Sequence, residues 1–182
     1  MGYKMTTDAF VLRGATDLTI TGASGGAETT LDTSLDTLNR EVLIIHEIDI
    51  QTGSTPIGAV DQYANDASVR LLSIHDAVQT ATGSLNLNST DYIGGVNTAF
   101  MVGGPGNAIT VQESKNPDSR DQASKDSVPL AIITDSTIVL RSGFSASTAS
   151  SASDTYQAKF RIICQRAKAD ADTYAALVTG LL

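Results

Sequence analysis

The chain has 182 residues, with 12 Lys and Arg against 20 Asp and Glu, which gives a formal net charge of −8. This length suits one domain with a single core, and 41% hydrophobic residues are too many for a disordered chain. The acidic balance opposes nonspecific binding to nucleic-acid phosphates, and the single cysteine, Cys164, excludes an intrachain disulfide and a cysteine-based zinc site.

Residues 1–40 alternate short strand-like pieces with turn residues. We expect strands at 9–12 and 17–21, and after them a flexible connector at 22–26, G-A-S-G-G. Residues 1–30 are therefore a candidate extended N-terminal arm, which precedes a β-sandwich of residues 31–168.

The strongest strand signal is the segment 40–51, R-E-V-L-I-I-H-E-I-D-I-Q, which has a period of two. In a regular strand, one face would carry Val42, Ile44, His46, Ile48 and Ile50. The other face would carry Leu43, Ile45, Glu47 and Asp49. Because the second face turns acidic toward its end, we expect a strand that is buried on both sides at one end and opens to water at the other.

Further strand signals occur at 69–75, 92–95, 99–102, 108–112, 128–133 and 136–141. The segment 103–107, G-G-P-G-N, is predicted to be a hairpin turn, because it lacks the lysine of a phosphate-binding loop. Two segments are predicted to be long loops. Residues 113–127 carry mixed charge, and residues 142–155 consist mostly of Ser, Ala and Thr.

The last predicted strand is 156–168, with Ala158, Phe160, Ile162 and Cys164 on one face. A buried hydrophobe is a better interpretation of Cys164 than a nucleophile. Residues 169–182 are predicted to form a short helix with Asp170 as its N-cap and an apolar stripe of Tyr174, Leu177, Val178 and Leu181. The sequence thus predicts one all-β domain over 1–182, a jelly-roll-like antiparallel β-sandwich with a short C-terminal helix.

Candidate catalytic and metal-binding residues are few. His46 and His75 could bind a metal with Asp49, but His46 and Asp49 are an odd number of residues apart and face opposite sides of a regular strand. Asp118, Asp121 and Asp126 could hold calcium, although Arg120 and Lys125 lie among them and favour a solvated loop. No nucleophile motif is present, so we expect no enzymatic activity, no cofactor and no metal site.

Four of the twelve cations lie on the last predicted strand: Lys159, Arg161, Arg166 and Lys168. They are the candidate interaction residues, and an anionic partner would be lipid headgroups, a packaged genome or an acidic neighbouring subunit. Lys159 and Arg161 share one strand face and Arg166 and Lys168 the other, so a single patch requires a bulge between them. The alternative is an ordinary solvated strand end.

From about residue 40 onward the chain has many short strands, Ser/Ala/Thr-rich and mixed-charge loops, and the closing strand 156–168 before a short helix. This layout resembles the single jelly-roll capsid proteins of tailless icosahedral dsDNA viruses of archaea and bacteria. The resemblance carries over no individual functional residue. It implies an eight-stranded sandwich of two Greek keys, with many copies in an icosahedral shell, in some members over an internal membrane. The absence of a basic arm departs from the jelly-roll capsids of small RNA viruses.

If the resemblance holds, the protein is a self-assembling structural component of a virion. Its partners are then other copies of itself and other virion proteins, with contact to an internal membrane or the genome left open and no sequence-specific binding of nucleic acid. Residues 1–30 would lie on an adjacent copy, and residues 113–127 and 142–155 would be inter-subunit or exterior loops.

Two alternatives remain open. The first is a lectin-like sandwich that binds glycans, with or without calcium held by loop carboxylates. Its weakness is that aromatic residues, which stack on sugars, are only 5% of the chain and Trp is absent. The second is a small hydrolase or cupin-type metal enzyme built on His46 and His75.

Overall fold

The computed structural model describes residues 2–53, 70–83, 91–102, 109–116 and 129–179. These residues form strands β1 (Tyr3–Met5), β2 (Phe10–Asp32), β3 (Glu41–Gln51), β4 (Arg70–Gln79), β5 (Tyr92–Val102), β6 (Ile109–Asn116), β7 (Ala131–Ile133) and β8 (Thr137–Ala169), the 3-10 turn η1 (Thr37–Asn39) and helix α2 (Ala171–Val178). Every pair of neighbouring strands is antiparallel. The predicted fold class, an all-β sandwich with a short C-terminal helix, is confirmed.

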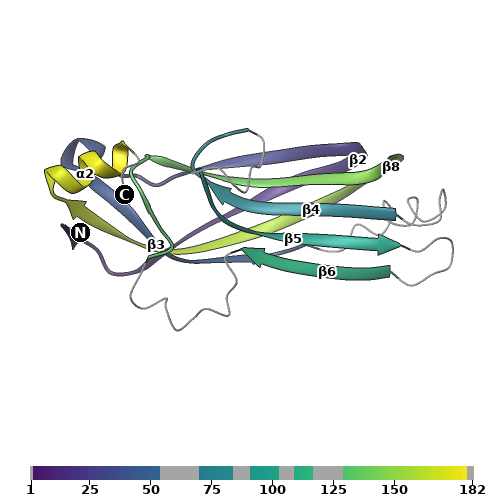
Figure 1. Cartoon of the computed structure of the whole chain (residues 1–182), viewed down its shortest axis with the longest axis horizontal. Helices are drawn as coiled ribbons and strands as arrows, with labels where there is room; N and C mark the ends of the chain where they lie inside the picture. The colour runs from purple at the N-terminus through teal and green to yellow at the C-terminus, as the bar shows by residue number, and fades with distance from the viewer. Residues whose placement is uncertain (1, 54–69, 84–90, 103–108, 117–128, 180–182) are drawn as a thin grey trace.

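The sheet is built around a two-stranded ribbon of β2 and β8, which lie side by side in Figure 1. This ribbon folds back on itself. Thr29 Oγ1 donates a hydrogen bond to Ala15 O at 2.8 Å, although the two residues lie 14 positions apart in one strand and would be roughly 45 Å apart if it were straight. The register shifts on both sides of Gly22, whose φ of 78° suits glycine. The bend is therefore at Gly22.

Each half of the ribbon has its own neighbours. Residues 22–32 and 137–150 continue through β4, β5 and β6, and we call this sheet the β4 layer. Residues 10–20 and 154–169 continue through β3 and β7 and also pair with β1, and we call this sheet the β3 layer. A folded ribbon with strands added to both halves is the winding of a jelly roll.

One apolar core lies between the two layers. Its fully buried members come from both halves of the ribbon and from β3 and β4, and they include Leu18, Ile20, Leu43, Ile45, Leu72, Ile74, Ile138, Leu140, Ile162 and Cys164. Ala158, Phe160, Ile162 and Cys164, predicted to share one face of the last strand, are all buried in it. Each large side chain contributes about 1.5–3 kcal/mol by leaving water, so this core is the main support of the fold.

The predictions of a flexible connector at 22–26 and of a loop at 142–155 are wrong. Residues 22–26 lie inside β2 and residues 142–155 inside β8, and residues 24–27 pair directly with residues 142–145. Small polar residues have little strand preference of their own, but residues 139–146 of β8 are hydrogen-bonded to β4 on their other side. Pairing along both edges, with Ser142 and Phe144 buried against the core, overrides the local preference.

The predicted loop 113–127 starts too early. Strand β6 extends to Asn116, because residues 113–116 still pair with β5. The remainder of that loop and the predicted turn at 103–107 lie outside the described residues.

The predicted N-terminal arm is also wrong. Residues 3–5 and 10–32 pair with β8 of the same chain, so these residues contribute strands to their own sandwich. The glycines at 22, 25 and 26 suggested a flexible break, whereas they allow the bend and the close packing of one long strand. In particular, a Cβ at Gly25 would lie 2.7 Å from the Phe144 ring.

Strand β3 contains one extra residue. Ile45 lies opposite Cys164 and Glu47 lies opposite Ile163, so His46 has no place in the regular register. Such a bulge reverses the alternation of side chains. As a result, Leu43, Ile45 and Ile50 face the same core, and the predicted division of this strand into two faces is wrong.

Helix α2 covers the outward side of β3. Val42 and Ile44 form a second buried cluster with Ala167 and Ala169, and Tyr174 and Leu177 of the helix pack against it. Figure 1 shows α2 at the left end, opposite the β2 and β8 labels. Of the rest of the predicted stripe, Val178 is 58% exposed and Leu181 lies outside the described residues.

The N-cap prediction for α2 is confirmed. The Asp170 side chain accepts a hydrogen bond from Thr173 N at 2.8 Å, and this bond lowers the pKa of Asp170. The helix begins one residue later, at Ala171, within the predicted range 169–182.

Candidate functional site

The four predicted interaction residues do not form one patch. Lys159 and Arg161 are exposed on the outer face of the β3 layer. Arg166 points to the other side, where Nη2 donates to Thr33 O at 3.0 Å and the guanidinium lies 5.6 Å from the centre of the Phe10 ring. Lys168 is exposed and pairs with Lys4 and Glu41 in the register. A single patch would need a bulge in β8 between Arg161 and Arg166. The bulge at this place lies in β3, at His46, so β8 runs regularly from Lys159 to Lys168 and its two faces stay separate.

Arg13 is a cation that the sequence interpretation missed. It is exposed and lies directly opposite Arg161 across β2 and β8. We call Arg13, Lys159 and Arg161 the cationic patch. It could have been found from the sequence only by recognising β2 as a partner of β8, because nothing in the local pattern links residue 13 to residue 161.

The two histidines do not converge. His46 Nε2 lies 2.8 Å from Gln165 Oε1 on the β3 layer, and His75 Nε2 lies 3.2 Å from Ser73 Oγ on the β4 layer. Burial lowers the pKa of His75, so its ring is neutral at pH 7. The third candidate ligand, Asp49, lies opposite Arg161.

Among the described residues, no three His, Cys, Asp or Glu side chains are grouped so that they could hold a metal ion. The calcium candidates Asp118, Asp121 and Asp126 lie outside the described residues.

A buried polar cluster joins the two layers. Tyr156 OH donates to Asp76 Oδ2 at 2.5 Å, Ser142 Oγ donates to Asp76 Oδ1, and Ser142 Oγ also contacts Thr16 Oγ1. Asp76 and Ser142 come from the β4 layer and Thr16 and Tyr156 from the β3 layer, and each residue is at most 1% exposed. Burial raises the pKa of Asp76 despite these hydrogen bonds, and burial together with the Asp76 carboxylate raises the pKa of Tyr156. The cluster is closed to solvent and pins the layers together.

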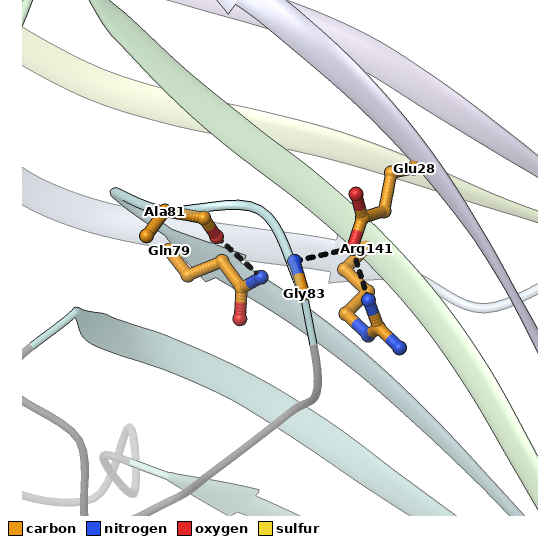
Figure 2. A network of polar contacts seen from close by, with 5 residues as sticks. All are labelled: Glu28, Gln79, Ala81, Gly83 and Arg141. Atoms are coloured by element: carbon orange, nitrogen blue, oxygen red, sulfur yellow. Dashed lines mark hydrogen bonds and ion pairs between the residues drawn. The ribbon is translucent and has the colours of Figure 1, made fainter.

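The turn after β4 is hydrogen-bonded to an ion pair of the β2–β8 ribbon (Figure 2). Arg141 Nη1 donates to Glu28 Oε1, which also accepts from Gly83 N at 3.0 Å, and Gln79 Nε2 donates to Ala81 O at 2.7 Å. Beside this pair, on the outer face of the β4 layer, a shallow groove of 580 Å³ is lined by Ser24, Gly26, His75, Arg141, Gly143 and Ser145.

Replacing Glu28 with Ala is expected to lower the free energy of unfolding by about 1–2 kcal/mol, because the Arg141 side chain, only 19% exposed, loses its charged acceptor. Hydrogen–deuterium exchange at Gly83 should become faster, because its amide loses the same acceptor. The matched control is Asp17→Ala on the same strand, which removes an exposed carboxylate bonded to Gln157 and should change stability by less than about 0.5 kcal/mol. Equal effects of the two substitutions would contradict a fastening role for Glu28.

Cys164 is expected to be chemically inert in the folded protein. Its side chain is fully buried, and burial raises the pKa of its thiol to about 11. Iodoacetamide at pH 8 should leave the native protein unmodified and should alkylate it completely in denaturant, as measured by intact mass. Rapid alkylation without denaturant would show that the thiol reaches solvent.

These features define a jelly-roll-like β-sandwich whose buried carboxylate and thiol are held inside the core and whose outer faces carry the exposed charges. No protein-family model matches this chain, and no curated protein does. Within the described residues, no helix is long and apolar enough to cross a membrane.

Proposed function

We propose that this protein is a structural virion protein, a capsid subunit that assembles with copies of itself into an icosahedral shell. The observation that supports this best is the folded β2–β8 ribbon, because it completes a jelly-roll core within a single chain. A subunit with a complete core leaves its outer faces and sheet edges for neighbouring copies. Contacts that are individually weak then become stable through their number.

The hydrogen bonds of the buried Asp76 and Tyr156 and of the half-buried histidines support a structural role rather than a chemical one. Asp76 and Tyr156 bond to each other in the core, and His46 and His75 bond to Gln165 and Ser73 on separate layers. The proposed partners are other copies of the chain and other virion proteins. Because residues 3–5 and 10–32 are paired within their own sandwich, assembly has to use surfaces rather than an N-terminal arm.

Assembly is tested by expressing the whole chain and measuring its mass by light scattering over a series of concentrations, with negative-stain microscopy of the same samples. Rings, shells or a mass that rises with concentration are expected. A protein that stays strictly monomeric at its highest soluble concentration contradicts the proposal.

A second candidate function is glycan binding. The observation that favours it is the groove on the β4 layer, where Ser24, His75, Arg141 and Ser145 offer hydrogen-bonding groups over the glycines of the sheet. A glycan array probed with and without calcium tests this function. Binding that is lost in His75→Ala would support it, and an array without signal would remove it.

A further inference from the structure

The outer face of the β3 layer places a cation directly opposite another cation. Arg13 and Arg161 are register partners, both exposed, and Lys159 lies two residues from Arg161 on the same face. The chain has only 12 Lys and Arg in 182 residues, so this clustering does not follow from a generally basic surface. Like charges directly opposite each other destabilise a sheet, and an anionic partner that covers them removes that penalty.

Protein carboxylates fit this patch better than a nucleic acid does. Asp49 lies beside Arg161 on β3, and Asp17, bonded to Gln157, follows Lys159 along the ribbon. These carboxylates and the net charge of −8 oppose a phosphate backbone, which needs a continuous run of cations. A surface with a few separated carboxylates suits a patch of mixed sign.

One end of the same chain offers such a surface. Thr33 N donates to Ser136 O at 2.8 Å, which brings the exposed Asp32 and Asp135 to the same end of the sandwich. Asp36 follows in the same segment and caps η1 by accepting from Asn39 N at 3.2 Å. Leu38 is 95% exposed in this turn, an unusual position for a large apolar side chain. We call Asp32, Asp36, Leu38 and Asp135 the acidic end.

We propose that the cationic patch of one copy binds the acidic end of a second copy, a contact that rests on the proposed self-assembly. Charge complementarity aligns the two surfaces. Val11 and Ile163 pair with each other two residues from Arg13 and Arg161, on the same face and only half-buried, and they give Leu38 an apolar seat.

The contact has to form between copies. Arg166, whose Nη2 donates to Thr33 O between Asp32 and Asp36, is five residues along β8 from Arg161, which is about 17 Å of strand. The cationic patch of one copy therefore meets a different surface, the acidic end, on the next copy. Such a heterologous contact repeats from copy to copy and closes into a ring when the rotation between copies permits it.

The test is a charge swap measured by light scattering and negative-stain microscopy. Arg13→Glu/Arg161→Glu and Asp32→Arg/Asp135→Arg should each raise the concentration needed for assembly by about tenfold or more, and an equimolar mixture should recover part of the loss. Leu38→Ala should weaken assembly as well. The matched comparison is Arg13→Glu against Lys4→Glu. Each variant reverses one exposed cation opposite a cation of β8, but Lys4 lies outside the cationic patch, so Lys4→Glu should weaken assembly clearly less than Arg13→Glu.

Each outcome decides something. If the wild type assembles and Arg13→Glu/Arg161→Glu assembles equally well, the proposed contact is wrong and the proposed function stands. If the wild type stays monomeric, the proposed function fails first. If the reversed variant does not fold, as judged by thermal melting, Arg13→Gln/Arg161→Gln replaces it and has to weaken assembly. Patch-dependent binding of the wild type to DNA, with assembly unchanged in the variants, would assign the patch to a polyanion and overturn the proposal.

Discussion

Replacing Asp76 with Ala is expected to lower the free energy of unfolding by about 3 kcal/mol relative to Asp76→Asn. Alanine removes the carboxylate oxygens that accept hydrogen bonds from Tyr156 and Ser142. The Tyr156 hydroxyl then has no acceptor, and the Ser142 hydroxyl keeps only its contact with Thr16. A buried donor without a partner costs about 1–3 kcal/mol. Asparagine keeps an acceptor for Tyr156 and can donate to Ser142 Oγ, so it is the matched control for the loss of charge alone.

The measurement is urea denaturation of both variants and the wild type, followed by circular dichroism. Similar unfolding free energies for the alanine and asparagine variants would show that the cluster does not hold the layers together. A lower free energy for both variants than for the wild type at pH 7 would show that the hydrogen bonds of the Asp76 carboxyl group outweigh the cost of burying it.

The pH dependence of the same proteins tests the state of the carboxyl group. Burial raises the pKa of Asp76 above its ordinary value of 3.8. Between 3.8 and the raised pKa the folded chain binds more protons than the unfolded chain, so this group makes stability fall as pH rises. Asp76→Asn lacks this titration. Its stability relative to the wild type is therefore expected to increase from about pH 4 toward neutral pH and to level off above the folded pKa. A difference that shrinks as pH rises would reverse the assigned direction.

Gly95→Ala is expected to lower the free energy of unfolding by about 2–3 kcal/mol, the upper part of the range for overpacking. A Cβ at residue 95 would lie 2.3 Å from the backbone oxygen of Asp76 and 3.0 Å from the Cα of Ala77. These are backbone atoms of β4, which cannot move without disturbing the β4–β5 ladder and the Asp76 cluster. The expected cost therefore arises from contact with fixed atoms.

The matched control is Gly143→Ala, the same change in the neighbouring part of the β4 layer. A Cβ there would meet only Gly25 O at 3.6 Å, an ordinary contact, and neither glycine has a positive φ. Because glycine is unfavourable inside a strand, this variant is expected to be neutral or up to about 1 kcal/mol more stable. Thermal and urea unfolding measure both variants, and equal losses would rule out the steric explanation for Gly95.

Part of the fold could be predicted from local pattern. The period of two in residues 156–168 identified the buried face of β8 correctly, and Asp170 marked the start of the helix. Both signals lie in adjacent residues, where alternation and capping are set by backbone geometry alone. The strand around Ile44 was found for the same reason, but its faces were assigned wrongly because a bulge at His46 depends on the register with β8.

The candidate surface depended on distant pairing. Lys159 and Arg161 were visible as neighbours in sequence, whereas Arg13 joined them only through the pairing of β2 with β8. The Asp76–Tyr156 bond likewise joins residues 80 positions apart, and no spacing rule connects them.

Local signals were enough to establish a β protein with a capped C-terminal helix, because alternation of side chains and a capping carboxylate act over a few residues. Long-range pairing was needed to show that the Ser- and Ala-rich residues 142–155 are strand, that residues 10–32 belong to their own sandwich, and that cations meet on one face. These features take their free energy from hydrogen bonds and burial shared between distant segments, which can outweigh the weak local preferences of small polar residues.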